Sequence, residues 1–377
     1  MTPVELSRTV LRAVRRAVDG GELSVTVPGR AVVTPPGPGG CGDFATTIAL
    51  QLARPAGQPS EKVAEILRPY LLDAPGVTDV VVTGPGFLNI SLGDTSAAAL
   101  VEEILRRGLR YGHVDRPAGQ IVQLHAPHEV RAVVVMQATA RILISQGALV
   151  RTSSEAPPRP EWTDILGAHV DAFGTPEAPA PLDVNVRPVP APADPTPLGR
   201  DAARWALLHP AAHDRPRITD EHLVQRESNP LFRVRYAHAR TRALSRNAAD
   251  LGFDAHPGDV QLEGPRPSDA HPATAHPADT HLTDTHRAHT PSGALITALA
   301  DHPRILRTTA EARTPDRLAR HLVTVADATL AFLPTVLPFG DEKPSVAHRS
   351  RLALAEAAGT VLAGGLTLLG IDAPDHI

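Results

Sequence analysis

The sequence is poor in cysteine and aromatic residues, and each shortage excludes a class of protein. One cysteine, Cys41, among 377 residues rules out a disulfide framework and a cysteine-based zinc site. Aromatic residues make up 3% of the chain, so its cores depend on Leu, Val, Ile and Ala. We expect no apolar run that approaches the roughly 18–20 residues of a membrane span, and no signal-peptide core opens the chain. We therefore expect a cytoplasmic protein without a membrane partner.

Lysine is almost absent as well. Lys62 and Lys343 are the two lysines among 37 basic residues, against a net charge of −4. This scarcity excludes any mechanism that needs a lysine-rich loop. An excess of Arg, Ala and Pro is typical of a genome of high G+C content, so arginine by itself is no evidence of function.

The pattern of apolar residues predicts an α+β first part, residues 1–117. A helical stripe runs from Val4 to Val18, and a second helix begins at Ser60. The turn residues Gly84-Pro85-Gly86 join two predicted strands, Thr78–Val82 and Phe87–Leu92. A third helix is expected from Thr95 to Arg110.

The rest of the chain changes character twice. A strand at Ile121–Leu124 and a helix at Arg131–Gln146 precede residues 151–198, where 11 prolines favour a linker. Helices are expected from Arg200 onward, including Asn229–Asp250, one capped by Thr314-Pro315 and one near His348–Leu369. Between them, residues 254–290 have few apolar side chains, and His271, His276, His281 and His286 recur every five residues. Because this stretch can bury too little apolar surface to offset its ordering entropy, we interpret 254–290 as a disordered insertion. Five-residue spacing puts no histidine pair on one helical face, so we do not expect a metal site.

The predicted helix 229–250 is basic and carries one tyrosine. Residues 200–250 contain ten arginines and six acidic residues. Arginines neutralise RNA phosphates and tyrosine stacks on unpaired bases, so Arg233, Tyr236, His238 and Arg240 are candidate RNA-binding residues. The alternative is a solvated basic face with Tyr236 in the core, and composition alone favours that alternative.

Two stretches at the start of the C-terminal part resemble the anticodon-binding domain of class I arginyl-tRNA synthetases. They are GRDAARWALL (199–208), with Asp201-Ala202-Ala203-Arg204 in place of the family's Asp-Ala-Leu-Arg signature, and SNPLFRVRYAHAR (228–240). The end of the chain, GGLTLLGIDAPDHI, is similar to the end of those enzymes. The resemblance implies an RNA-binding role for Asn229, Arg233, Tyr236, His238 and Arg240.

The N-terminal part resembles the additional N-terminal domain of the same family. The similar segments are CGDFATTIALQLAR (41–54) and GPGFLNISL (84–92). In the family this domain holds the outer corner of tRNA at the D-loop, which implies RNA contacts by Asp43, Phe44, Thr46 and Gln51. The family usually has Asn where this chain has Thr47.

Between these two parts the resemblance to the enzymes fails. No His-x-Gly-His motif follows Ala126-Pro127, and no lysine for a Lys-Met-Ser-Lys loop stands between Lys62 and Lys343. In the family these motifs hold ATP phosphates and stabilise the adenylation transition state. About 80 residues, too few for a complete catalytic domain, separate the two resembling parts. His125 and His128 are interpreted as surface residues of a loop that has lost its purpose.

We therefore expect an α+β chain of three domains. These are a small α+β N-terminal tRNA-binding domain (1–117), a truncated, Rossmann-like α/β remnant with a Pro-rich linker (118–198), and an all-α anticodon-binding bundle of the DALR kind (199–377). The expected function is a catalytically inactive arginyl-tRNA synthetase paralogue that binds tRNA, with tRNA(Arg) as first candidate. No catalytic residue, cofactor, metal or DNA partner is expected. The alternatives are a scaffold that binds another protein and a divergent active arginine–tRNA ligase.

Overall fold

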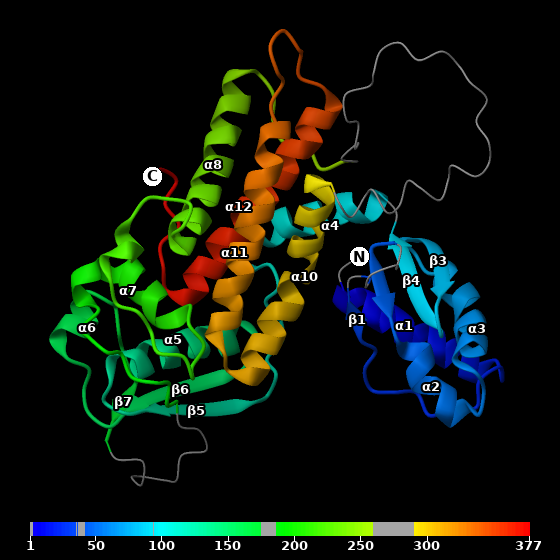
Figure 1. Cartoon of the computed structure of the whole chain (residues 1–377), viewed down its shortest axis with the longest axis horizontal. Helices are drawn as coiled ribbons and strands as arrows, with labels where there is room; N and C mark the ends of the chain where they lie inside the picture. Colours follow the sequence, from blue (N-terminus) through cyan, green and yellow to red (C-terminus); the bar gives the residue numbers. More distant parts are fainter. Residues whose placement is uncertain (1–2, 35, 37–41, 93, 175–185, 259–289) are drawn as a thin grey trace. The chain divides into compact units, whose positions relative to one another are not determined.

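The computed structural model describes residues 3–34, 36, 42–92, 94–174, 186–258 and 290–377, which form two compact units (Figure 1). The first unit comprises Met1–Glu102, Ala255–Asp301 and Asp341–Leu354; the second comprises Glu103–Asp254, His302–Gly340 and Ala355–Ile377. Cys41 and most of the predicted histidine-rich insertion, 259–289, lie outside the described residues. The three-domain boundaries expected from the sequence stay a prediction.

A four-stranded antiparallel sheet organises the N-terminal part of the first unit. Its strand order is β1-β2-β4-β3, and it packs with α1, α2 and α3. The helices bury apolar stripes of which Leu6, Val10 and Leu67 are fully inaccessible. The bounds are α1 Pro3–Asp19, β1 Val33–Thr34, β2 Phe44–Thr46, α2 Ile48–Ala56, α3 Ser60–Leu72, β3 Val77–Thr83, β4 Phe87–Leu92 and α4 Asp94–Arg107.

The turn between β3 and β4 needs its second glycine. Gly86 has φ +111°, and a Cβ there would lie 2.9 Å from the backbone of Ser60. A side chain is excluded on both counts. The sequence prediction of this hairpin is confirmed, since the predicted strands differ from β3 and β4 by at most one residue at an end.

The second unit contains a three-stranded parallel sheet of order β5-β6-β7, with α5 connecting β5 to β6. This is a βαβ unit, the building block of α/β domains. The sequence predicted the first strand and the helix but missed β6 and β7, because LVRTSS and AF carry no sustained apolar pattern. The bounds are β5 Ile121–Ala126, α5 Val130–Ser145, β6 Leu149–Ser154, α6 Pro160–Asp164 and β7 Ala172–Phe173.

A buried guanidinium fastens α5 to the chain that follows the sheet. Arg131 is fully inaccessible and donates hydrogen bonds of 2.7–3.1 Å to five backbone carbonyls. Burial lowers the pKa of Arg131. One side chain thus supplies donors to a segment with little regular structure of its own. The five acceptors are Val189, Leu207, Pro210, Ala211 and Asp214.

Helices dominate after residue 198, as the sequence predicts. The residue Arg204 of α7 is fully buried and donates from Nε to the carbonyl of Leu369, 2.9 Å away, and from Nη1 to Leu166. Burial, with the neighbouring Arg141 guanidinium, lowers the pKa of Arg204 to about 9. The bounds are α7 Gly199–Leu208, α8 Pro230–Asp250, α10 Pro291–Ala312, α11 Pro315–Phe332 and α12 Val346–Leu369.

Two expectations need correction. The predicted disordered insertion began at residue 254, yet residues 254–258 are placed, and the amide of His256 donates to the carbonyl of Arg349 at 3.1 Å. The expectation that no apolar run approaches a membrane span is also wrong, because α12 is long and apolar enough to cross a bilayer, with a mean hydropathy of 1.7. Because 78% of that apolar window is buried inside the protein, α12 has the character of a core helix.

Candidate nucleic-acid interface

The outer face of α8 carries a stacked row of two rings and a guanidinium. The rings of Phe232 and Tyr236 stack with centroids 5.3 Å apart. Arg240 lies over the Tyr236 ring at 5.6 Å and donates from Nη1 to its hydroxyl at 2.9 Å. Positions i, i+4 and i+8 share one helix face, so the three side chains form a continuous surface. We call Phe232, Tyr236 and Arg240 the aromatic–arginine row.

The row is accessible. Arg240 is exposed and the two rings are half-buried, whereas Val234 and Ala237 on the opposite side are inaccessible. The structure puts Ala237 in the core and Phe232 beside Tyr236 on the accessible face. Tyr236 is therefore neither a core residue, as the alternative interpretation required, nor isolated.

Two predicted RNA-binding residues of α8 have structural partners. Asn229 is buried, accepts the amide of Leu231 as the helix N-cap, and donates from Nδ2 to the carbonyls of His222 and Val224, each at 2.9 Å. Arg233 pairs with Asp327 of α11 at 2.9 Å. Asn229 thus fixes the loop before α8, and Arg233 joins two helices.

The third, His238, faces the C-terminal segment. It is buried, and its Nδ1 lies 3.0 Å from the carbonyl oxygen of Pro374. Burial lowers the pKa of His238. One turn further along α8, Arg242 pairs with Asp375 at 3.1 Å. This side of α8 therefore holds residues 370–377 in place and is not free for a ligand.

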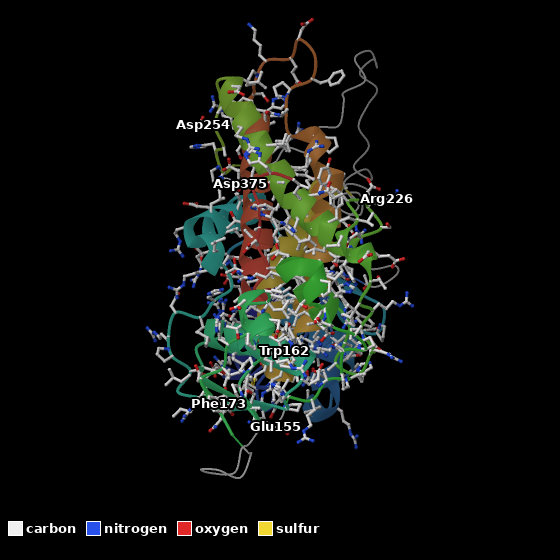
Figure 2. All side chains as sticks on the ribbon, turned by 90° about the vertical axis from the view of Figure 1, so that its left-hand side faces the viewer. Glu155, Trp162, Phe173, Arg226, Asp254 and Asp375 are labelled. Carbon is white, nitrogen blue, oxygen red and sulfur yellow. The ribbon has the colours of Figure 1, made fainter. Side chains whose placement is uncertain are left out.

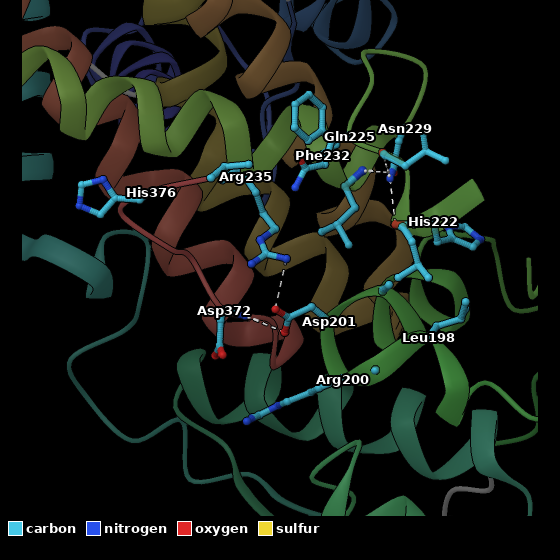
Figure 3. A pocket seen from close by; sticks show the side chains of 16 residues that line it. Leu198, Arg200, Asp201, His222, Gln225, Asn229, Phe232, Arg235, Asp372 and His376 are labelled. Carbon is cyan, nitrogen blue, oxygen red and sulfur yellow. Dashed lines mark hydrogen bonds and ion pairs between the residues drawn. The ribbon is translucent and has the colours of Figure 1, made fainter. Parts of the chain in front are cut away.

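A pocket of about 510 Å³ opens beside the N-terminal half of α8 (Figure 3). Phe232 contributes an aromatic wall, and the Arg235 guanidinium lies 3.4 Å from the Asp201 carboxylate. Asp201 also accepts the amide of Asp372 at 3.1 Å, which ties the C-terminal segment to the pocket floor. The remaining lining includes Arg200, His222, Gln225 and His376. An aromatic wall, cations and amide donors and acceptors are groups that recognise a nucleobase and its phosphate.

Sequence reasoning missed Phe232 and Arg235. Both stand within the motif SNPLFRVRYAHAR, but the motif gives no indication of which side chains reach a cavity. The pocket also depends on residues 198–202 and 372–377, which are far from α8 in the sequence.

The N-terminal candidates mostly support their own domain. The Asp43 carboxylate accepts the amide of Leu92 at 2.6 Å, Phe44 is 5% exposed, and Thr46 is buried with its hydroxyl donating to the carbonyl of Val32. Gln51 is exposed on α2. Among these four predicted RNA-binding residues, Gln51 has its side chain at the surface and the others are engaged in the fold.

The carboxyl edge of the parallel sheet is where open α/β domains bind ligands. Here the N-terminus of α5 is capped by Glu129, whose carboxylate accepts the amides of Ala132 at 2.8 Å and Ala191 at 3.1 Å. At the end of β6, the Glu155 carboxylate accepts the amide of His128 at 3.1 Å. Figure 2 shows Glu155 with Trp162 and Phe173 at one end of the second unit. Carboxylates thus accept one amide of the first turn of α5 and one amide of the loop before it, where a phosphate would otherwise be favoured.

One of the two histidines at this edge differs from expectation. His125 was interpreted as a surface loop residue, which is wrong: it lies in β5, is 2% exposed and has Nδ1 3.0 Å from Ser153 Oγ. Burial lowers the pKa of His125, which favours the neutral ring. His128 is partly exposed, with Nε2 3.0 Å from the carbonyl of Pro157 and its ring beside Trp162. The described residues contain no group of three His, Cys, Asp or Glu side chains that could hold a metal ion.

Comparison with known proteins matches both ends of the chain. Residues 5–92 match the family "Arginyl tRNA synthetase N terminal domain" and residues 234–377 the family "DALR anticodon binding domain". The arginine–tRNA ligase of Paenarthrobacter aurescens is 25% identical over an alignment of 575 positions that covers 100% of both chains. That of Frankia alni is 36% identical over 156 residues, 41% of this chain and 28% of the relative. Arginyl-tRNA synthetase of Thermus thermophilus has a similar fold, with a TM-score of 0.67, 15% identity and full coverage of both chains.

These findings indicate the class of protein first: a chain whose two ends are similar to the terminal domains of an aminoacyl-tRNA synthetase, the second of them to an anticodon-binding domain. More particularly, the chain is arginyl-tRNA synthetase-like. Its 377 residues fill at most 377 of the 575 aligned positions, so at least 198 positions of the Paenarthrobacter alignment have no counterpart here.

Proposed function

We propose that this protein binds tRNA through α8 and the N-terminal domain and does not join arginine to tRNA. The observation that carries the binding half is the aromatic–arginine row. Two half-buried rings offer stacking surfaces, and the Arg240 guanidinium beside them offers a positive charge. Among the residues that the structure describes, no carboxylate pairs with this guanidinium. Stacking on an unpaired base contributes about 1–3 kcal/mol per base.

Three observations support the second half of the proposal. The α5 N-terminus already carries the Glu129 carboxylate, and Glu155 occupies the neighbouring amide. A triphosphate approaching this edge would meet two negative charges. No lysine lies between residues 62 and 343, and at least 198 aligned positions are missing. These observations support a site that no longer binds ATP productively.

Binding is tested by titrating unfractionated bacterial tRNA against the full chain in a filter-binding assay. We expect a dissociation constant below about 10 µM that rises with salt, because phosphate contacts release counterions. The variant Phe232→Ala/Tyr236→Ala should weaken binding by about 5- to 150-fold, the equivalent of one stacked base. Phe339→Ala is the matched control, since Phe339 is 92% exposed and lies off α8.

Arg233 is a poor choice for this test, because removing it leaves Asp327 unpaired. Arg240→Gln removes the row's charge without orphaning a carboxylate. Equal affinity of all variants and wild type would reject the row as the RNA contact. It would favour the scaffold alternative.

Catalysis is tested separately. ATP–pyrophosphate exchange in the presence of arginine and tRNA should stay at the level of a no-protein blank. Clear exchange would overturn the second half of the proposal and identify an active arginine–tRNA ligase, with which the family relationship is compatible.

A further inference from the structure

The exposed face of α1 gathers arginines in a part of the chain that is electrically balanced. Residues 1–92 contain eight basic and eight acidic residues. Four of the eight basic residues lie on α1, and three of them, Arg8, Arg12 and Arg15, are exposed on one face at spacings i, i+4 and i+7. The domain therefore concentrates positive charge on one helix without being basic itself.

The three arginines differ from two exposed arginines on α1 and α4 that have carboxylate partners. Arg16, next in sequence, pairs with Asp73 at 2.8 Å, and Arg106 pairs with Glu103 at 2.7 Å. None of the carboxylates in the described residues pairs with Arg8, Arg12 or Arg15. The Arg12 guanidinium donates to the hydroxyl of Thr9 at 3.1 Å, which directs it along the helix.

The stripe also has a shape. Arg8, Arg12 and Arg15 line a shallow hollow of about 420 Å³, together with Leu11 and Glu5. Leu11 is half-buried and gives the hollow an apolar floor between the guanidiniums. At a rise of 1.5 Å per residue, the arginines extend over about 10 Å of helix, a length that spans more than one phosphate of a nucleic-acid strand.

The helix that carries the stripe is held rigidly. On its inner face Leu6, Val10, Val14 and Ala17 are fully inaccessible. The stripe is therefore preorganised, and binding would order only the arginine side chains.

We infer that Arg8, Arg12 and Arg15 form a second RNA contact, one that follows the phosphate backbone of tRNA with no selection of bases. This rests on the proposed tRNA binding and deepens it. It also accounts for how the N-terminal domain could hold RNA when Asp43, Phe44 and Thr46 are engaged in its own fold. An acidic protein surface would meet the same charges, but the family relationship favours RNA.

The test compares two triple variants with equal loss of charge. R8Q/R12Q/R15Q removes the stripe, and R30Q/R54Q/K62Q removes three exposed cations elsewhere in the same domain. Glutamine has a helix propensity close to that of arginine, and the replaced side chains are exposed. Both variants should therefore have the melting temperature of wild type. The probe is unfractionated bacterial tRNA, in filter binding from 50 to 200 mM NaCl.

We expect R8Q/R12Q/R15Q to lose at least tenfold in affinity at 0.1 M salt. The slope of log affinity against log salt should become shallower by about 2, since each phosphate contact contributes roughly 0.7–0.9. The control triple variant should change the slope by less than 1. If wild type binds tRNA and both variants behave alike, the stripe is not an RNA contact and the α8 proposal stands. If wild type does not bind tRNA, both proposed RNA contacts, the one on α8 and the one on α1, are rejected. An acidic protein partner then explains the exposed arginines better.

Discussion

Arginine is used in opposite ways in two regions of the second unit. Around α5 and α7, Arg131 and Arg204 are fully inaccessible and donate to backbone carbonyls. On the outer face of α8, Arg240 is exposed and lies on the ring of Tyr236. The first kind holds the chain together, and the second leaves its charge available to a ligand. Counting arginines between 200 and 250 could not separate the two, because the difference lies in their partners.

The same contrast applies to the two edges that could bind a phosphate. The carboxyl edge of the parallel sheet presents Glu129 and Glu155, whereas α8 presents rings and a cation. The edge where open α/β domains bind ligands thus carries two carboxylates, whereas the aromatic–arginine row carries a cation. Four predictions test whether buried polar groups stabilise the fold more than exposed ones do.

The largest effect is expected at Arg131. Arg131→Met leaves five carbonyls without their donor and should lower the free energy of unfolding by about 3–5 kcal/mol in urea denaturation. Arg116→Met, at an exposed position, should change it by less than about 0.5 kcal/mol. A loss under about 1 kcal/mol for Arg131→Met would show that this interior guanidinium is replaceable.

Acid should destabilise the second unit next most strongly. His302 is buried, its ring stacks on Tyr111 and His321, and burial, with nearby His321 and His113, lowers its pKa well below 6.5. The folded protein keeps His302 neutral while the unfolded chain protonates. Stability is therefore complete above pH 6.5 and falls as the pH drops below it, by up to about 1.4 kcal/mol per pH unit for this histidine.

His302→Phe keeps a ring in the stack and removes the titration. Between pH 6.5 and 5, the free energy of unfolding should fall less for His302→Phe than for wild type. The difference should be the contribution of one titrating histidine, up to about 1.4 kcal/mol per pH unit. Parallel curves for the two proteins would mean that His302 is charged in the fold. Other histidines with a lowered pKa, including His113 and His238, should leave a residual slope in both.

An intermediate effect is expected at the start of α8. Asn229→Ala removes the N-cap and the donors to two loop carbonyls and should cost about 1–2 kcal/mol in thermal or urea unfolding. Thr314→Ala is a matched control, because Thr314 precedes α11 but makes no side-chain capping bond. Equal costs at the two positions would contradict the role assigned to Asn229.

The smallest effect concerns the partly exposed pair of Arg233 and Asp327. A double-mutant cycle with Arg233→Gln and Asp327→Asn should give a coupling of about 0.2–1 kcal/mol, because solvent screens such pairs. A coupling above about 2 kcal/mol would show that Arg233 acts as a buried structural group, like Arg131 and Arg204.

Local patterns predicted much of the fold. The β3–β4 hairpin, α5 and α8 were expected within a few residues, since each combines an apolar period with clear turn or cap residues. The strand β6 was missed because Arg151, Thr152 and Ser153 carry no apolar pattern, and β5 supplies its partner from 28 residues earlier. His125 was misplaced for a related reason: a polar residue after a short strand is typical of a loop until a neighbouring strand buries it.

The candidate site was predicted only in part. The sequence identified α8 and its Tyr236 and Arg240, because a basic helix with an aromatic residue can be recognised from residue identity and spacing. It did not separate them from Asn229, Arg233 and His238, which are turned toward the loop, α11 and the C-terminal segment. The pocket beside Phe232 and Arg235 was not visible at all.

By itself, the sequence determined the family likeness, the loss of the ATP motifs and the positions of the longer helices, because these depend on residue identity and local periodicity. Tertiary structure alone decided which arginines are interior and which carboxylates occupy the sheet edge. It also set the aromatic–arginine row apart from the core. Those properties depend on which distant segments pack against a side chain, and desolvation and hydrogen-bond partners act through space, not along the chain.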